Sequence, residues 1–345
     1  VYYTPAYIVD YIVKQTVGGQ IEDRSPAQLA GLRNGKQPLR VLDMACGSGS
    51  FLLGAYQCLL DHCLKWYVEH KPERHKKAVY NGRSGQWRLT IEEKKRILTT
   101  HIFGVDIDPQ AVEVTKLSLL LKVLEGETDL SVVRQMQMFR ERALPNLAGN
   151  IKGGNSLIGP DYFVGELIPD AVELKRVNPF DWKREFPDAA KSGGFDCIIG
   201  NPPYVRIHNL VDFHPGEVRF IQDNFETARF GKVDIYVAFI EKGLQLLRKS
   251  GRLGFIVPNK FMQADYGVGL RKLLTSKQAL FELVDFGNAQ VFEAVTTYTC
   301  LLFLAGASQP TLGAKFNRSQ VPPISFLADS PIEKRPARSF GVTPW

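Results

Sequence analysis

The sequence lacks the features that mark membrane proteins, disulfide-bonded proteins and zinc proteins. No apolar run is long enough to cross a bilayer, and no low-complexity tract is present. The five cysteines form no CxxC pair and stand in mostly apolar surroundings, so we expect neither a disulfide framework nor a metal site. With no signal peptide at the start, these absences favour a protein of the reducing cytoplasm that is not bound to a membrane.

Length and composition are those of a large globular domain. The chain has 345 residues, 44% of them hydrophobic and 23% charged, which is enough to bury a sizeable core. It begins at Val1 rather than at a methionine, and we expect it to be a piece of a longer protein. From Gly306 onward the composition turns to Ser, Pro, Gly and Arg. This change predicts a main domain over 1–305 and a linker over 306–345, with one short strand at 322–327.

Strand-like and helix-like segments alternate along the chain, which indicates an α/β fold. Thr4 is predicted to cap a helix over about 4–17 in which Pro5 takes the first position. The strands that follow are apolar throughout, which is typical of a doubly wound parallel sheet covered on both faces. The last two lie close together and predict an antiparallel pair at one end. The expected strands cover 39–43, 101–106, 195–200, 251–258, 280–286 and 299–305.

A basic segment interrupts this alternation between the first two strands. The net charge is +7, from 43 Lys and Arg against 36 Asp and Glu, and residues 71–96 hold nine Lys and Arg against three Asp and Glu. We expect a basic helical insertion over about 66–98 that contacts phosphates. The alternative is a solvated surface whose charge only keeps the chain in solution. The candidate phosphate contacts are Lys76, Lys77, Lys94 and Lys95.

Polar residues follow the first two strands, at the edge where ligands bind in parallel sheets. The glycine turn 45–49 opens a helix, but it does not match the dinucleotide pattern GxGxxG, because Leu52 stands at the last glycine position. A phosphate ligand is therefore not required. Asp106 is placed to accept hydrogen bonds from ribose hydroxyls or to cap the next helix, and Asp108 is expected to be a cap.

The strand at 195–200 runs into Asn201-Pro202-Pro203-Tyr204. The two prolines cannot donate to a sheet and hold φ near one value, so the turn is rigid and its carbonyl groups point in fixed directions. A rigid turn of polar and aromatic residues at this edge predicts a functional site.

Four motifs together resemble those of the S-adenosylmethionine-dependent DNA adenine-N6 methyltransferases. They are ACGSGSF at 45–51, GVDIDP at 104–109, GNSL at 154–157 and IIGNPPY at 198–204. The opening YYTPAYIVDYIV resembles the N-terminal motif of the gamma arrangement, as in the methylase part of large type IIG-like restriction-modification enzymes. The resemblance covers roughly 2–305 and implies a Rossmann-like seven-stranded sheet, mostly parallel with an antiparallel end strand. It also implies a double-stranded DNA partner and a bacterial or archaeal cytoplasm.

The resemblance assigns a set of residues to the cofactor S-adenosylmethionine. Thr4 and Asp43 would hold its methionine end, and the glycine turn would allow close backbone approach through Ala45, Cys46, Gly47 and Gly49. The ribose falls to Asp106 with Ile107 beside it. Asn155 stands where the family has an aspartate that accepts from the cofactor's adenine, or it is only a turn residue.

The resemblance also gives the Asn-Pro-Pro-Tyr turn a chemical task. The side-chain oxygen of Asn201 and the main-chain carbonyl of Pro202 would accept the hydrogens of adenine's amino group and localise its lone pair. Pro203 would stiffen the turn, and Tyr204 would stack on the flipped base. Phe292 would form the opposite wall of the base pocket, or it packs in the core.

Other functions share parts of this pattern. Cytosine-C5 methylation is excluded because no Pro-Cys dipeptide is present, whereas cytosine-N4 methylation stays open. Protein-glutamine N5 methylation poses the same lone-pair problem and uses the same turn, and a catalytically silent DNA-binding subunit is a further alternative. The family places a target-recognition domain after the catalytic one and often a nuclease before it; we expect both outside this chain.

Overall fold

The computed structural model describes most of the chain. Backbone and side chains are described for residues 4–32, 37–82, 85–127, 144–165, 168–229, 233–288, 291–292, 297–307 and 341–345, and the backbone alone for 313–318 and 333–336. Among these residues no helix combines the length and apolar character needed to span a bilayer.

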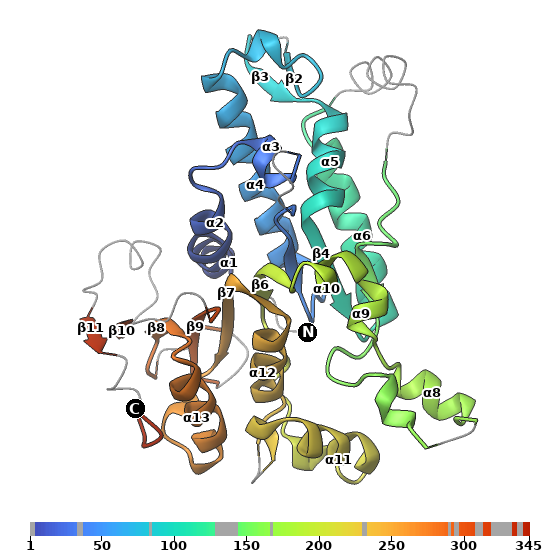
Figure 1. The fold of residues 1–345 in the computed structure, drawn as a ribbon, viewed down its shortest axis with the longest axis vertical. Helices are drawn as coiled ribbons and strands as arrows, with labels where there is room; N and C mark the ends of the chain where they lie inside the picture. Colours follow the sequence, from blue (N-terminus) through green and yellow to red (C-terminus); the bar gives the residue numbers. More distant parts are fainter. Residues whose placement is uncertain are drawn as a thin grey trace.

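The centre of the fold is one sheet with the strand order β11-β10-β8-β9-β7-β6-β1-β4-β5 (Figure 1). Strands β7, β6, β1, β4 and β5 run parallel, and β9 pairs antiparallel with both β7 and β8. The mostly parallel sheet with an antiparallel end is therefore confirmed. The strands are β1 (Val41–Asp43), β4 (Ile102–Asp106), β5 (Ile151–Gly153), β6 (Phe195–Gly200), β7 (Leu247–Pro258), β8 (Leu280–Asp285), β9 (Thr299–Ala305), β10 (Gly313–Arg318) and β11 (Glu333–Pro336).

Two strands extend the sheet beyond the seven expected. Strand β10 pairs parallel with β8, and β11 pairs antiparallel with β10, so the segment that we expected to be a linker adds to the sheet edge. The strand expected at 322–327 lies outside the described residues.

Both faces of the sheet are buried under helices. All six residues of β6 are buried, and they alternate between two apolar cores: Ile198 belongs to one, and Cys197 and Ile199 belong to the other. One core contains residues of α1, α4, α5 and α6, and the other contains residues of α9, α10, α12 and α13. These helices are α1 (Ala6–Val13), α4 (Ser50–Glu69), α5 (Ile91–His101), α6 (Pro109–Leu124), α9 (Trp182–Glu185), α10 (Pro187–Lys191), α12 (Tyr236–Leu246) and α13 (Val268–Lys277).

The N-terminal helix differs from the prediction at both ends. Helix α1 continues through a π-helical turn, Lys14–Gly18, into α2 (Gly19–Ile21). Thr4 does not cap it: Pro5 occupies the flanking position, and no side chain caps the helix. The prediction was wrong because the Thr4 hydroxyl is instead engaged by Asn201, far along the chain.

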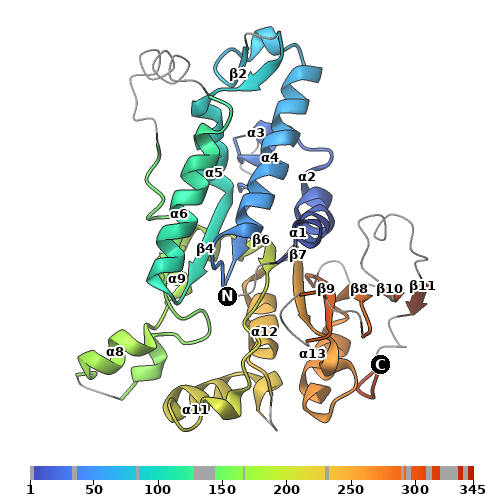
Figure 2. The same ribbon diagram turned by 180° about the vertical axis from the view of Figure 1, so that it is seen from behind.

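The basic insertion is a β-hairpin between two helices rather than wholly helical. Strands β2 (Val79–Asn81) and β3 (Trp87–Leu89) pair antiparallel between the end of α4 and the start of α5. Helix α4 begins at the carboxyl edge of the sheet, and its 20 residues carry the chain about 30 Å away. The hairpin therefore lies at the far end of the molecule from the ends of β4 and β6, as both ribbon views show (Figures 1 and 2).

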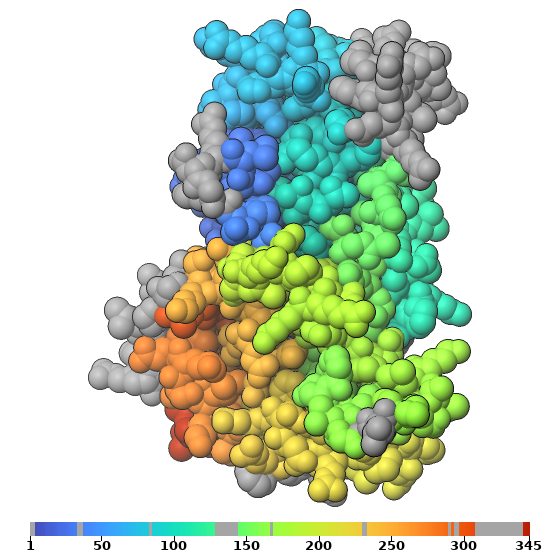
Figure 3. Space-filling view, turned by 45° about the vertical axis from the view of Figure 1, so that its right-hand side comes forward, coloured from blue at the N-terminus to red at the C-terminus, as the bar shows by residue number. Residues whose placement is uncertain are grey.

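Short helices cover the opposite end of the molecule. The green and yellow surface of α8 (Ala171–Val177) and α11 (Pro215–Asn224) lies there, away from the cyan hairpin (Figure 3). Arg176 on α8 forms an ion pair with Glu217 on α11, and the Tyr162 ring lies 5.6 Å from that of Phe220. These contacts join segments that flank the carboxyl edge of the sheet.

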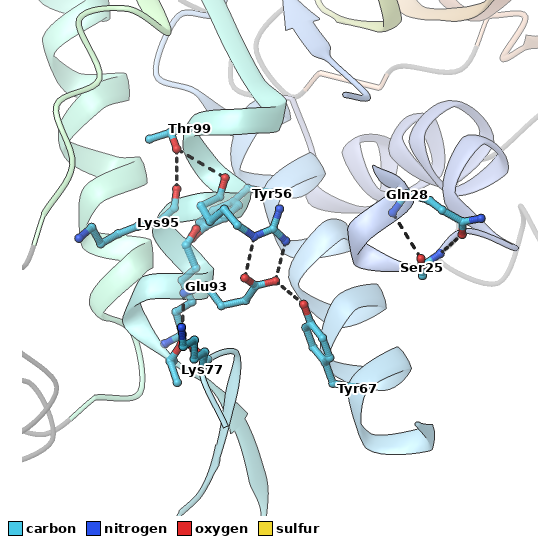
Figure 4. Close-up of polar contacts among 11 residues, drawn as sticks. Ser25, Gln28, Tyr56, Tyr67, Lys77, Glu93, Lys95 and Thr99 are labelled. Carbon is cyan, nitrogen blue, oxygen red and sulfur yellow. Dashed lines mark hydrogen bonds and ion pairs between the residues drawn. The ribbon is translucent and has the colours of Figure 1, made fainter. Parts of the chain in front are cut away.

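A buried polar network holds α4 against α5 (Figure 4). The Tyr67 hydroxyl donates to Glu93 Oε1 at 2.9 Å, and Arg96 donates to both Glu93 oxygens at 2.6 and 2.7 Å. Glu93 is 5% exposed. The same view shows Ser25 and Gln28 closing a capping box on α3 (Pro26–Leu29). The carboxylate of Glu93 thus fixes the two long helices that carry the hairpin.

We predict that Glu93→Gln lowers the free energy of unfolding by about 2–4 kcal/mol, because it leaves the partly buried Arg96 guanidinium without its charge partner. The measurement is urea denaturation. Glu113→Gln is the matched control, since Glu113 pairs with Lys116 at an exposed position and should cost about 0–1 kcal/mol. Equal losses in the two variants would contradict this assignment.

Candidate active site at the carboxyl edge of the sheet

Three neighbouring strands end beside one another. Strand β1 lies between β4 and β6, and it ends at Asp43, while β4 ends at Asp106 and β6 leads into Asn201. Because the three strands are parallel, their carboxyl ends form one edge, where ligands bind in open α/β sheets. The residues predicted from the separate motifs are therefore brought to the same edge.

The turn after β1 needs glycine at two positions. Gly47 has φ +53° and Gly49 has φ +86°, a region that other residues rarely adopt. The turn is held by the Cys46 N–H, which donates to Val105 O at 3.0 Å, and by the Thr115 hydroxyl, which donates to Gly47 O at 2.8 Å. A Cβ atom on Gly47 would meet no described atom within 4 Å. The backbone of the turn is thus open to a ligand on that side.

Asp106 is tied to this turn. Its Oδ2 accepts from the Gly47 N–H at 2.7 Å, and its Oδ1 accepts from the Asp108 N–H at 2.9 Å. Each carboxylate oxygen keeps a further lone pair, so Asp106 can still accept from a ligand. Asp108 accepts from the Gln110 N–H and caps α6, as predicted, and Ile107 between the two aspartates is 52% exposed.

Asp43 is the most deeply buried carboxyl group of the site, at 2% exposed. Its Oδ1 accepts from the Ala45 N–H at 3.0 Å, while its buried Oδ2 has no hydrogen-bond partner among the described residues. Burial raises the pKa of Asp43 to about 8, and the Asp106 carboxylate adds to the rise. A Cβ atom on Gly200 would lie 2.6 Å from Asp43 Oδ1, so only glycine fits at the end of β6.

Asn201 presents an oxygen without a donor. Its Nδ2 donates to Thr4 Oγ1 at 3.2 Å, which fixes the orientation of the amide. The opposite atom, Oδ1, is buried and has no partner in the described part of the chain. An unpaired buried acceptor costs about 1–3 kcal/mol, so this orientation is expected where a ligand supplies the missing donor. Thr4 was predicted at the site, but its bond to Asn201 was not.

The rest of the turn is fixed by neighbours. Pro202 is buried and Pro203 is exposed. The Tyr204 hydroxyl donates to Ile256 O on β7 at 3.0 Å, and its ring meets Tyr236 edge to face, with ring centroids 6.3 Å apart. Burial raises the pKa of Tyr204 well above its ordinary value, so the hydroxyl stays a donor. The ring is therefore held in one orientation.

Two predicted site residues have structural contacts within the protein. Asn155 Oδ1 accepts from the Leu157 N–H at 3.1 Å and the Ile158 N–H at 3.3 Å, so it closes a turn with the oxygen that was expected to face a ligand. Phe292 is 5% exposed and belongs to the apolar core of α1 and α4. These contacts are those of a turn residue for Asn155 and of a core residue for Phe292.

The four lysines are not brought to this edge. Lys94 pairs with Glu127 at 3.0 Å and Lys95 with Glu92 at 3.4 Å. Lys76 and Lys77 are exposed beside the hairpin, beyond the far end of α4. No cluster of three or more metal-ligating side chains occurs among the described residues.

Sequence reasoning missed the segment that braces the turn. Residues 205–207 pair with 233–235: the Ile235 N–H donates to Val205 O and the Ile207 N–H donates to Val233 O, both at 2.8 Å. Arg206 and Asp234 form the bridge between them. The short run VDIY at 233–236 gives no periodic signal, because one isolated bridge is shorter than a strand pattern.

We predict that Asp43→Asn stabilises the fold by a margin that grows from about pH 4 to pH 8. Asp43 binds its proton more tightly in the folded state, so the wild type loses stability as pH rises over this window, and asparagine cannot ionise. Asparagine also keeps the oxygen that Ala45 needs. Thermal unfolding at several pH values measures the margin, with the exposed cap variant Asp108→Asn as control; a margin independent of pH would contradict the buried state of Asp43.

Comparison with known proteins gives one family. Residues 100–292, more than half of the chain, match the model of the Eco57I restriction-modification methylase, and residues 1–139 match that of the N-6 DNA Methylase. The type II restriction enzyme and methyltransferase RM.Eco57I of Escherichia coli is 34% identical over 301 residues, which cover 87% of this chain and 27% of that protein. The chain thus spans about a quarter of this relative's length.

Solved structures share the fold. The cryo-electron microscopy structure of the DrdV–DNA complex aligns with a TM-score of 0.57 at 16% identity, over 99% of this chain and 31% of that one. The type IIG restriction endonuclease BpuSI aligns with a TM-score of 0.54 at 12% identity, with the same coverage of 99% and 31%. By the match over 100–292, the chain belongs to the Eco57I restriction-modification methylase family.

Proposed function

We propose that this chain transfers a methyl group from S-adenosylmethionine to the N6 amino group of an adenine flipped out of double-stranded DNA. The observation that carries the proposal is the buried, unpartnered Oδ1 of Asn201, because an amino group is the donor it lacks. Membership of the restriction-modification methylases supports adenine over the cytosine and glutamine alternatives, which would use the same acceptor.

The residues at the edge suit the cofactor. Once Asp43 is ionised, its unpartnered Oδ2 can accept a hydrogen bond from the methionine end of the cofactor, and the open side of Gly47 admits the cofactor to the backbone. Asp106 has lone pairs left for ribose hydroxyls, whereas the Asn155 oxygen is already used. When bound, S-adenosylmethionine supplies a methyl group on a positively charged sulfur. A positive charge near Asp43 would also favour its ionised form.

The adenine amino group is a poor nucleophile, because its lone pair is delocalised into the ring. Two neutral acceptors, Asn201 Oδ1 and the Pro202 carbonyl, would take its two hydrogens and localise the lone pair on nitrogen. Thr4 holds the Asn201 amide so that the oxygen, not the nitrogen, faces the substrate. The new N–C bond forms as the S–C bond breaks, and the amino proton then leaves to water.

Tyr204 would receive the face of the flipped base. Its hydroxyl is tied to Ile256 O, so the ring needs no ordering when the base arrives. Stacking would offset part of the few kcal/mol that unstacking a base from the duplex costs.

We also propose that parts of the working enzyme lie outside this chain. Its relative RM.Eco57I, several times longer, is named both a restriction enzyme and a methyltransferase. We expect a target-recognition domain, and a nuclease if the parent protein cleaves DNA, to be fused to this domain or to bind it. The DNA substrate of a restriction-modification system would place it in a bacterial or archaeal cytoplasm.

Asn201→Ala should lower kcat for methyl transfer to DNA by about 100- to 1,000-fold, because it removes an acceptor aimed at the reacting amine. Cofactor affinity should change little. Incorporation of labelled methyl groups into DNA and calorimetry with the cofactor measure the two effects. Asn209→Ala, at an exposed asparagine beside the same turn, is the control and should match the wild type. Wild-type turnover by Asn201→Ala would refute the role.

Tyr204→Phe and Tyr204→Ala separate the ring from its hydroxyl. The phenylalanine variant keeps the stacking face and should lose little activity, whereas alanine should weaken DNA binding by about 1–3 kcal/mol through lost stacking. Binding to DNA that carries an unpaired target adenine gives the comparison. Equal losses in both variants would show that Tyr204 acts through the hydrogen bond from its hydroxyl to Ile256 O on β7 and not through stacking.

A further inference from the structure

Three basic side chains lie close to the Asn-Pro-Pro-Tyr turn, and the methyl-transfer chemistry does not use them. We call Arg206 and Lys260 the edge cations, and His208 is the third basic residue. Arg206 follows Tyr204 by two residues, and Lys260 follows the last residue of β7 by two. The side chains of Arg206 and Lys260 are exposed, and that of His208 is partly buried. These three residues follow β6 and β7, whereas the lysines near the hairpin lie beyond the far end of α4.

The backbone that carries Arg206 is fixed. The two hydrogen bonds between 205–207 and 233–235 form an antiparallel bridge with Arg206 opposite Asp234. Successive side chains in such a bridge point to opposite sides, and Ile207 is 2% exposed in the core. Arg206 therefore projects outward from a rigid support just after the predicted base-stacking tyrosine.

The support of Lys260 is equally firm. Asn259 before it donates from its backbone to Tyr298 O at 3.0 Å and from its side chain to Asp285 Oδ1 at 2.9 Å. Strand β7 is hydrogen-bonded to β6, which leads into Asn201. Lys260 thus stands at the end of the strand next to the one that carries the predicted catalytic residue.

One carboxylate, that of Asp234, lies near the edge cations. Arg206, Lys260 and His208 all lower the pKa of Asp234, against the rise caused by its burial, so all three lie within electrostatic reach of it. Within the described residues, neither Arg206 nor Lys260 forms an ion pair, and His208 Nδ1 is buried without a partner. Two positive charges beside one carboxylate leave a net positive charge on this surface.

We propose that the edge cations bind the phosphates of the DNA strand on either side of the flipped nucleotide. A nucleotide swings out of a duplex by rotation about its backbone, so an enzyme must hold the flanking phosphates while the base enters the pocket. Arg206 and Lys260 offer unpaired cations beside that pocket, whereas Lys94 and Lys95 are ion-paired and the hairpin lies about 30 Å along α4. This inference rests on the proposed DNA substrate.

The test compares two double variants that remove the same charge. Arg206→Gln/Lys260→Gln should reduce the slope of log affinity for duplex DNA against log salt by about 1.8, because each phosphate contact contributes about 0.9. Lys76→Gln/Lys77→Gln, beside the hairpin, should leave the slope unchanged. Equal thermal unfolding midpoints for wild type and variants show that the exposed substitutions leave the fold intact. Equal slopes for the wild type and the Arg206/Lys260 variant would overturn the proposal.

A second arm changes the DNA. Methylphosphonate linkages on both sides of the target adenine should weaken wild-type binding and leave the Arg206/Lys260 variant unaffected, because the contact is already lost. Equal weakening of both proteins would place the contact on other residues and overturn the proposal. Methyl transfer by the wild type is scored separately. If the wild type transfers methyl groups but the Arg206/Lys260 variant keeps the wild-type slope, only the role of the edge cations is refuted. If the variant has a reduced slope but the wild type transfers no methyl group, the role of the edge cations is upheld and the proposed reaction is refuted.

Discussion

The site depends on two buried side-chain oxygens that have no hydrogen-bond partner among the described residues. Asn201 Oδ1 and Asp43 Oδ2 lie at the ends of adjacent strands. Gly200 precedes Asn201, and it must be glycine because any side chain there would strike Asp43. Each unpaired buried polar atom opposes folding, so the surrounding structure must hold it in place. Thr4 orients the Asn201 amide, Ala45 holds one Asp43 oxygen, and the parallel hydrogen bonds of β6, β1 and β4 fix the rest.

Charged groups have different surroundings inside the site, on the outer side of the Asn-Pro-Pro-Tyr turn and between α4 and α5. Asp43 has its pKa raised to about 8, which prepares it to respond to a cationic ligand, while the acceptors proposed for the amine are neutral. On the outer side of the turn, Arg206 and Lys260 remain unpaired among the described residues and face solvent. In contrast, Glu93 and Arg96 neutralise each other inside the arm that carries the hairpin. Charged residues thus stabilise the fold in one place and, in the proposed function, contact cofactor and DNA in the other.

The sequence predicted what depends on local pattern and missed what depends on distant partners. Apolar strands, the glycine turn and the Asp108 cap follow from short-range rules, and all three are present. The Thr4 cap was wrong because its partner is 197 residues away. Lys94 could not be recognised as paired because Glu127 lies 33 residues further on. The hairpin strands have three residues each, which is too short for a period-two pattern to be detected.

The proposed reaction requires that the unpartnered oxygen of Asn201 accept a hydrogen bond from the amino group of an adenine. The most direct measurement is to incubate the protein with labelled S-adenosylmethionine and either plasmid DNA or cell protein, digest both, and identify the methylated unit by mass spectrometry. We expect N6-methyldeoxyadenosine from the DNA. Label found only in N4-methyldeoxycytidine, or only in N5-methylglutamine from protein, would contradict it.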